Sequence, residues 1–212
     1  AGREDEARST CEILHDYVGS LGDPTLWPVV SSAVSRLSIM QGRPELGKGR
    51  LDSITLPADG AMLWWLDTPS ITRCRALIAE GAREGLSEAE TRLLGLVETN
   101  EAHHNRFQLI IILTLLAMVF EKQARTDEAL TVLERALTLA HPGGLVFPFL
   151  ELGTPMTALL EKLPRDTAIG PFIEQILAAA APVGSTVGNG PRRVEQPPAD
   201  LLTDREAEIL EL

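Results

Sequence analysis

The sequence contains few aromatic residues, since phenylalanine, tryptophan and tyrosine together make up 4% of its 212 residues. A β-sandwich normally uses more aromatic and β-branched side chains, whereas this chain is rich in alanine and leucine. The hydrophobic fraction of 44% is still large enough to fill a core. The composition therefore favours helices that pack through small and aliphatic side chains.

Positive charge is also scarce: 19 Lys and Arg residues stand against 30 Asp and Glu residues, which gives a formal net charge of −11. An acidic surface repels the phosphate backbone of nucleic acids, so we do not expect these residues to bind DNA by themselves. The sequence has no basic amphipathic face of the kind that binds anionic membranes. Neither nucleic acid nor a membrane surface is therefore an expected direct partner.

Cysteines and long hydrophobic runs are rare as well. Cys11 and Cys74 lie far apart, outside any C-x-x-C motif, which is typical of buried thiols in a reducing compartment. The most apolar run, residues 109–120, is too short to cross a bilayer and is typical of a core helix. Residues 1–9 contain no signal-peptide hydrophobic segment, so we expect a cytoplasmic protein.

Helical periodicity dominates the sequence, and turn residues divide it into segments. The predicted helices span residues 4–20, 23–40, 44–54, 68–81, 87–103, 105–123, 126–140, 154–163 and 169–181. The predicted N-caps include Thr68, Ser87, Thr126 and Thr154, and Glu90 would complete a capping box with Ser87. Residues 55–67 and 145–155 are predicted to be connecting segments.

A repeat is visible in three helix–turn–helix segments. Their turns align at Gly42, Gly81 and Ala124, which lie 39 and 43 residues apart. The second helix of each segment carries a small residue that would let the paired helices approach closely: Gly47, Ala89 and Ala129. The pattern predicts an all-α fold of antiparallel helical hairpins stacked as a tetratricopeptide-like right-handed α-solenoid. A plain helical bundle is the alternative.

The segment ALTLAHPGGLVFPFLELGTPMTALL, residues 136–160, resembles the C-terminal part of the sensor region in MalT-like large LuxR-type transcriptional regulators of the STAND class. LDTPSITRCRALIAEG, residues 66–81, resembles the start of a repeat in the same family. The resemblance is weakest over residues 1–60. The family usually carries a basic residue shortly after the PGG sequence, where this chain has Phe147 and Pro148.

The final segment, LTDREAEILEL, resembles the opening of a LuxR-type helix-turn-helix domain, with Thr203, Arg205 and Glu206 among the matching residues. The Pro- and Gly-rich stretch before it is predicted to be a flexible linker. The resemblance implies a helical sensor and relay domain over residues 1–181, a linker over 182–200 and a truncated DNA-binding domain over 201–212. The recognition helix is absent, so DNA would be bound only through the missing C-terminal domain.

Polar and aromatic residues near the predicted turns are candidates for an effector- or partner-binding surface. They are Trp64, Trp65, Arg75, His103, His104, Asn105, Arg106 and Gln108. Adjacent tryptophans can stack on sugars or aromatic ligands, although packing between repeats is the more usual role. Adjacent histidines without an H-E-x-x-H motif are more typical of a helix end than of a metal site.

Two functions follow from these patterns. The first is an effector-sensing and protein-interaction domain of a bacterial LuxR-type regulator, which relays a signal to a C-terminal DNA-binding domain. Its partners would be an unidentified small-molecule effector or regulatory protein and, since the resembled family self-assembles, further copies of the chain. The alternative is a tetratricopeptide-like scaffold that binds proteins without a small-molecule effector. We expect no catalytic residue, metal or cofactor, because no enzyme motif or Walker A sequence is present.

Overall fold

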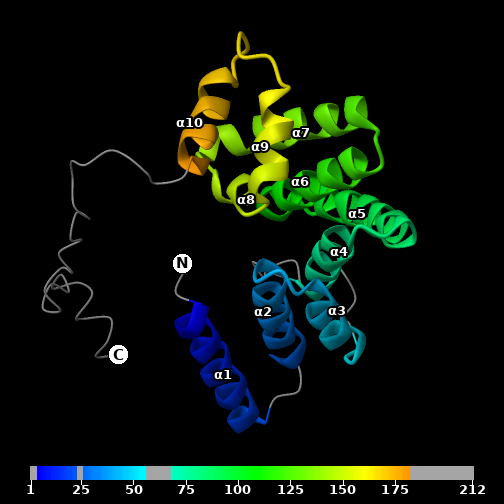
Figure 1. The fold of residues 1–212 in the computed structure, drawn as a ribbon, viewed down its shortest axis with the longest axis vertical. Coiled ribbons are helices and arrows are strands. Elements are labelled where there is room, and N and C mark those ends of the chain that lie inside the picture. Colours follow the sequence, from blue (N-terminus) through cyan, green and yellow to red (C-terminus); the bar gives the residue numbers. More distant parts are fainter. Residues whose placement is uncertain (1–3, 23–25, 56–67, 182–212) are drawn as a thin grey trace, which may run out of the picture. The chain divides into compact units, whose positions relative to one another are not determined.

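The computed structural model describes residues 4–22, 26–55 and 68–181, all of which lie in one compact unit, Ala1–Ala181 (Figure 1). Every secondary-structure element within these ranges is helical, which confirms the predicted all-α, tetratricopeptide-like solenoid. The predicted linker and the predicted start of a DNA-binding domain lie outside the described residues and stay predictions.

The helices largely follow the predicted segments. They are α1 (Glu4–Leu21), α2 (Trp27–Met40), α3 (Pro44–Asp52), α4 (Pro69–Glu80), α5 (Arg83–Ala102), α6 (Arg106–Lys122), α7 (Thr126–Ala140), the 3-10 helix η3 (His141–Gly143), α8 (Phe147–Leu150), α9 (Gly153–Glu161) and α10 (Gly170–Ala180). One difference is α8, a single helical turn within the predicted connecting segment 145–155.

Three helical hairpins, α2–α3, α4–α5 and α6–α7, pack on one another in chain order (Figure 1). The turn residues Gly42, Gly81 and Ala124 adopt left-handed backbone conformations, with φ of 74°, 72° and 60°. Successive hairpins are also joined by a buried hydrogen bond of 2.7 Å between the hydroxyls of Ser32 in α2 and Thr72 in α4. The three aligned turns thus share a left-handed residue, which directly follows the helix at Gly81 and is the second residue after the helix at Gly42 and Ala124.

The small residues predicted in the second helices lie at the contacts between paired helices. Ala89 and Ala129 are fully buried, and Gly47 is buried against α2. A Cβ atom added to Gly47 would lie 2.8 Å from the backbone oxygen of Ser35, which is too close for an unstrained contact. Gly47 therefore allows the backbones of α2 and α3 to approach each other directly, as the sequence pattern predicts.

The predicted capping box at the start of α5 is wrong. The helix begins at Arg83, one turn earlier, so Ser87 lies within the helix and caps nothing. Gly81 already reverses the chain in a left-handed conformation and Ala82 is extended, which lets the new helix start immediately. By contrast, the predicted cap of α4 is confirmed, because the hydroxyl of Thr68 accepts a hydrogen bond from the backbone N–H of Ile71.

The predicted caps at Thr126 and Thr154 are also wrong. Thr126 is the first residue of α7, and its hydroxyl donates a hydrogen bond of 3.0 Å to Oε2 of Glu121. Helix α9 already begins at Gly153, whose positive φ of 62° ends the preceding turn, so Thr154 lies inside the helix. Helix α7 therefore begins at its predicted cap residue, and α9 begins one residue before its predicted cap residue.

Helix α6 is the centre of the core. All residues from Gln108 to Phe120 are buried, because α4, α5, α7, α8 and α9 surround this helix. This explains the long apolar run in the sequence, since a helix covered on every side needs no polar face. No helix in the described ranges is both long and apolar enough to span a membrane.

Candidate functional site

The candidate residues predicted from the sequence do not form a single site. Trp64, Trp65, Thr203, Arg205 and Glu206 lie outside the described residues. Arg75 is buried in α4. His103, His104 and Asn105 form the turn between α5 and α6, while Arg106 and the buried Gln108 lie in the first turn of α6.

The α5–α6 turn uses its polar residues to satisfy helix ends. Nδ1 of His103, the residue that ends α5, donates a hydrogen bond of 2.8 Å to the backbone oxygen of Thr99. His104 is exposed with a φ of 55°, and the side chain of Asn105 accepts a 3.3 Å hydrogen bond from the backbone N–H of Gln108. These contacts agree with the helix-end interpretation of the histidine pair, while the proposed role of this surface in binding stays a prediction.

Arg75 belongs to a buried ionic bridge between separate elements. Its Nη1 atom lies 3.1 Å from Oε2 of Glu151, and Nε of Arg36 lies 2.6 Å from Oε1 of the same carboxylate. The side chains of Arg75 and Glu151 are only 6% and 4% exposed, and that of Arg36 is 23% exposed. One carboxylate thus joins α2 and α4 to the connection between α8 and α9.

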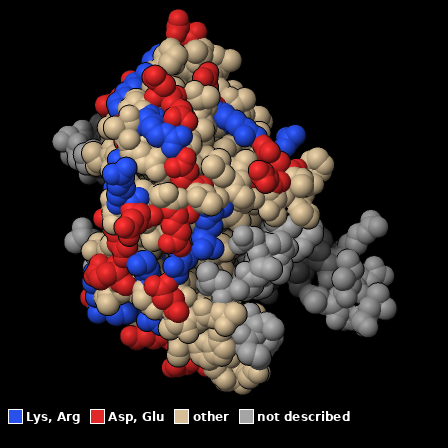
Figure 2. Space-filling view, turned by 90° about the vertical axis from the view of Figure 1, so that its right-hand side faces the viewer, with Lys and Arg blue, Asp and Glu red and all other residues tan. Residues whose placement is uncertain are grey.

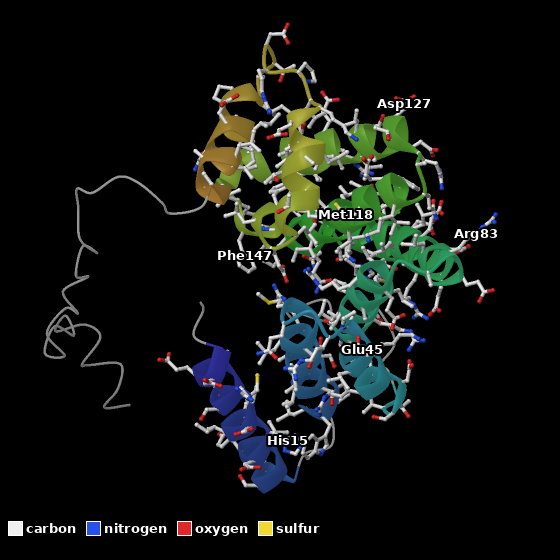
Figure 3. All side chains as sticks on the ribbon, viewed as in Figure 1. His15, Glu45, Arg83, Met118, Asp127 and Phe147 are labelled. Carbon is white, nitrogen blue, oxygen red and sulfur yellow. The ribbon has the colours of Figure 1, made fainter. Side chains whose placement is uncertain are left out.

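Local backbone turns place Glu151 at this junction. Gly144 and Gly153 both have positive φ values, and between them the short helix α8 directs the following turn toward α2 and α4. Phe147, at the start of α8, lies on the side nearest to α2 (Figure 3). The guanidinium group of Arg36 lies 5.7 Å from the centre of its ring, a cation–π contact that holds Arg36 over α8.

A pocket of about 300 Å³ adjoins the ionic bridge, and its walls come from α2, α4, α6 and the α8–α9 connection. Most of its lining is apolar and includes Ile39, Met40, Ile78, Leu115, Met118 and Pro155. Met118 lies on the central helix α6, close to α9 (Figure 3). The charged lining consists of Arg36, Arg75, Lys122 and Glu151, three cations and one carboxylate.

Lys122 differs from the two arginines of this pocket. It is the last residue of α6 and is exposed, so its ammonium group is accessible to solvent. Among the residues that the structure describes, no carboxylate lies within ion-pairing distance of Lys122, whereas both arginines contact Glu151. Sequence reasoning identified Arg75 but missed Arg36, Lys122 and Glu151, because their proximity depends on the packing of four elements.

A second, larger hollow of about 860 Å³ lies between α1 and the α2–α3 hairpin. Its lining mixes acidic and basic side chains and includes Cys11 and His15. Burial raises the pKa of the Cys11 thiol, an effect that the nearby Arg50 opposes. A raised pKa favours the protonated thiol, which is the less nucleophilic form.

Charged residues also form networks on the face that contains α5 and α3. Arg73 pairs with Asp52 and Glu88, and Arg92 pairs with Glu88. Figure 2 shows acidic and basic side chains interspersed over this face. Exposed pairs of this kind contribute little to stability, and they leave no large patch of one charge sign in this view.

Arg125 forms a clamp at the turn between α6 and α7. Its guanidinium group donates hydrogen bonds to Glu90 on α5 and Glu128 on α7, at 2.7 and 2.6 Å, and lies 4.2 Å from the ring centre of Phe120. The hydrogen bond from Arg125 holds the pKa of both carboxyls below their ordinary value. The clamp ties the second hairpin to the third and has a structural role.

In the described ranges no group of three or more His, Cys, Asp or Glu side chains is arranged to hold a metal ion. The pocket beside Glu151 combines mostly apolar walls with a few convergent charged groups, a combination typical of small-molecule sites.

Residues 64–166 match the family model described as a MalT-like TPR region. The matched range covers the hairpins α4–α5 and α6–α7 together with α8 and α9, and it includes Arg75, Lys122 and Glu151. No curated protein and no solved structure matches the chain.

Proposed function

We propose, because residues 64–166 match the family model described as a MalT-like TPR region, that the chain is the effector-sensing and protein-interaction domain of a bacterial LuxR-type transcriptional regulator. The family match is the observation that carries this proposal. The pocket beside Glu151 supports it, because its walls come from all three stacked hairpins. A ligand in such a pocket contacts several repeats at once.

The proposed mechanism is a shift between arrangements of the hairpins. A ligand that binds one arrangement more tightly increases its population in proportion to the difference in affinity. The changed surface would then favour self-association or contact with a partner protein. The signal would pass through the predicted linker, residues 182–200, to the DNA-binding domain whose predicted start includes Thr203, Arg205 and Glu206.

A thermal-melting screen of the chain against sugars, amino acids and small aromatic compounds tests the sensing function. A ligand present at 100 times its dissociation constant adds about 2.7 kcal/mol to the free energy of unfolding. For a domain of this size that corresponds to a rise in Tm of roughly 5–10 °C. We expect at least one class of compound to raise the Tm in a concentration-dependent and saturable manner.

The scaffold alternative predicts a different pattern in the same experiment. A scaffold without an effector would show an unchanged Tm with every compound class, yet it would retain a specific protein partner in an affinity capture. That combined result would contradict the sensing function. Capture of a partner whose affinity changes when a stabilising compound is added would instead support both sensing and relay.

A further inference from the structure

The pocket beside Glu151 has the dimensions and position of a small-ligand site. Its volume of about 300 Å³ lies at the lower end of the range for small-molecule pockets, so it suits a compact ligand. Its walls come from α2, α4, α6 and the α8–α9 connection, so every hairpin of the stack contributes. A ligand here would bridge elements that are far apart in the sequence.

The charged lining of the pocket favours an anion. Among its described lining residues the charged ones are Arg36, Arg75, Lys122 and Glu151, three cations and one carboxylate, and both arginines pair with that carboxylate. Among the described residues, Lys122 has no carboxylate within ion-pairing distance, whereas Arg73 on the surface pairs with Asp52 and Glu88. The apolar walls lower the dielectric constant beside these cations and so strengthen their attraction for an anion.

The Glu151 bridge shows which anion these groups recognise. A carboxylate already lies between the guanidinium groups of Arg36 and Arg75, at 2.6 and 3.1 Å. Because Glu151 lines the same pocket, a ligand with two or more negative charges would be repelled by it. A ligand with a single negative charge is attracted by Lys122 at the mouth of the pocket and is repelled least by Glu151.

The remaining walls require an apolar ligand body. Ile78, Leu115 and Met118 form part of the lining, and Met40 at the end of α2 is 62% exposed beside it. Methionine side chains adapt to ligands of different shape, and two of them line this pocket. A fully polar ligand would place its hydrogen-bonding groups against these apolar walls, which offer them no hydrogen-bond partner.

We propose that this pocket binds a small monocarboxylate with an apolar body. Its carboxylate contacts Lys122 and shares the guanidinium groups of Arg36 and Arg75 with Glu151, while its apolar part lies against the aliphatic walls. This inference rests on the proposed function, since it names the chemical class of the effector. It also locates the effector between the hairpins whose arrangement would carry the signal.

Matched pairs of probes test this assignment by calorimetry and by thermal melting of the chain. Octanoate and benzoate carry both the charge and an apolar body, whereas octanamide and benzamide have similar shapes without the charge. Acetate has the charge without the body. We expect saturable binding of at least one of the two apolar carboxylates, with much weaker binding of its amide and of acetate.

Two variants connect binding to the pocket. Lys122→Gln removes the exposed cation and should weaken carboxylate binding roughly three- to tenfold, as expected for loss of a partly solvated charged partner. Ala79→Phe adds bulk at an exposed residue of the pocket lining and should abolish binding. Lys48→Gln is the control, because Lys48 pairs with Glu80 and does not line the pocket.

The outcomes separate this inference from the proposed function. Carboxylate binding that is lost in Ala79→Phe and weakened in Lys122→Gln but not in Lys48→Gln supports the assignment. Equal binding of acids and amides, no binding of either acid, or unchanged binding in both pocket variants overturns it. If a compound from the wider screen raises the Tm of wild type and Ala79→Phe equally, the sensing function stands and only this inference falls.

Discussion

Ala124 adopts a left-handed backbone conformation, with a φ of 60°, at the turn where the two earlier hairpins have glycine. This conformation costs a residue with a Cβ atom about 1–2 kcal/mol. Glycine avoids that cost but loses about 0.5–1 kcal/mol through the greater freedom of the unfolded chain. We therefore predict that Ala124→Gly raises the free energy of unfolding by about 0.5–1 kcal/mol, measured by urea denaturation.

The reverse substitution is the control for this prediction. Gly81 has an equivalent φ of 72°, and a Cβ atom added there would meet only the flexible end of Lys122, at 3.6 Å. Gly81→Ala should lower the free energy of unfolding by about 1 kcal/mol through backbone strain alone. A stabilising Gly81→Ala, or a destabilising Ala124→Gly, would show that the aligned turns are not equivalent.

Gly47 and Gly49 offer a second test within one helix, α3. Gly47→Ala should destabilise the protein by roughly 1–3 kcal/mol, because its Cβ atom would lie 2.8 Å from the backbone oxygen of Ser35. Gly49→Ala should stabilise it by roughly 0.5–1 kcal/mol, because nothing lies within 4 Å and alanine favours the helix. Denaturant unfolding of the two variants should give opposite signs, and equal signs would contradict the close approach of α2 and α3.

Some of these residue roles could be predicted from the sequence and others could not. The spacing of Gly42, Gly81 and Ala124 identified the turns, because a repeat imposes the same backbone path each time. No pattern in the sequence indicates the roles of Arg36 and Lys122. Each lies on a helix with a plausible exposed face, and only the distance between helices reveals what these side chains meet.

The Glu151 bridge acts on whole elements, because it joins α2 and α4 to the α8–α9 connection. Glu151→Gln keeps the shape of the side chain but leaves two arginines without their shared counter-charge. Removing one partner of a buried ion pair costs about 3–5 kcal/mol, and the partial exposure of Arg36 reduces this to roughly 2–4 kcal/mol. Urea denaturation of this variant should show a loss of that size.

Glu88→Gln makes the same chemical change in an exposed network. The Glu88 side chain is 41% exposed, and pairs of this kind contribute at most about 1 kcal/mol. Its effect should therefore be clearly smaller than that of Glu151→Gln. Equal losses in the two variants would mean that burial of the bridge does not determine its contribution.

The clamp around Arg125 makes the contact between α5 and α7 sensitive to acid. The folded-state pKa of Glu90 lies below its ordinary value of 4.5, chiefly because of the hydrogen bond from Arg125. A carboxyl with a lowered pKa stabilises the fold above its unfolded pKa, and this stability is lost as the pH falls through the folded value. We predict that Glu90→Gln reduces the loss of stability between about pH 5 and pH 3, measured by denaturation at successive pH values.

Glu98 provides the matched control on the same helix. It is exposed, and within the described ranges it forms no ion pair. Glu98→Gln should leave the pH dependence of stability close to that of wild type. If both variants have the same slope as wild type, the clamp does not link α5 to α7 in solution.

For whole helices, the sequence predicts their existence better than the residues at which they begin and end. The apolar run of α6 and the PGG turn after α7 gave clear boundaries, because each signal had no nearby competitor. At α5, Ser87 and Gly81 offered competing starts, and the left-handed turn at Gly81 determined the outcome. The single turn of α8 is too short for periodicity to reveal.

Within the unit Ala1–Ala181 the three hairpins pack on one another in chain order, and one hydrophobic core extends from α4 to α10. The repeat pattern predicted this architecture, because stacking is the usual way for such hairpins to bury their apolar faces. The pocket could not be predicted in this way. Its volume and charge depend on small distances among three hairpins and the α8–α9 connection, which no single segment of sequence encodes.

The proposal that these hairpins sense a small effector as a unit can be tested by hydrogen exchange. Amide exchange is measured on the chain with and without the compound that raises its Tm most. We predict that the compound slows amide exchange in α2, α4 and α6 together, because all three helices line the pocket beside Glu151. A chain that no compound stabilises, or protection confined to helices outside this pocket, would contradict it.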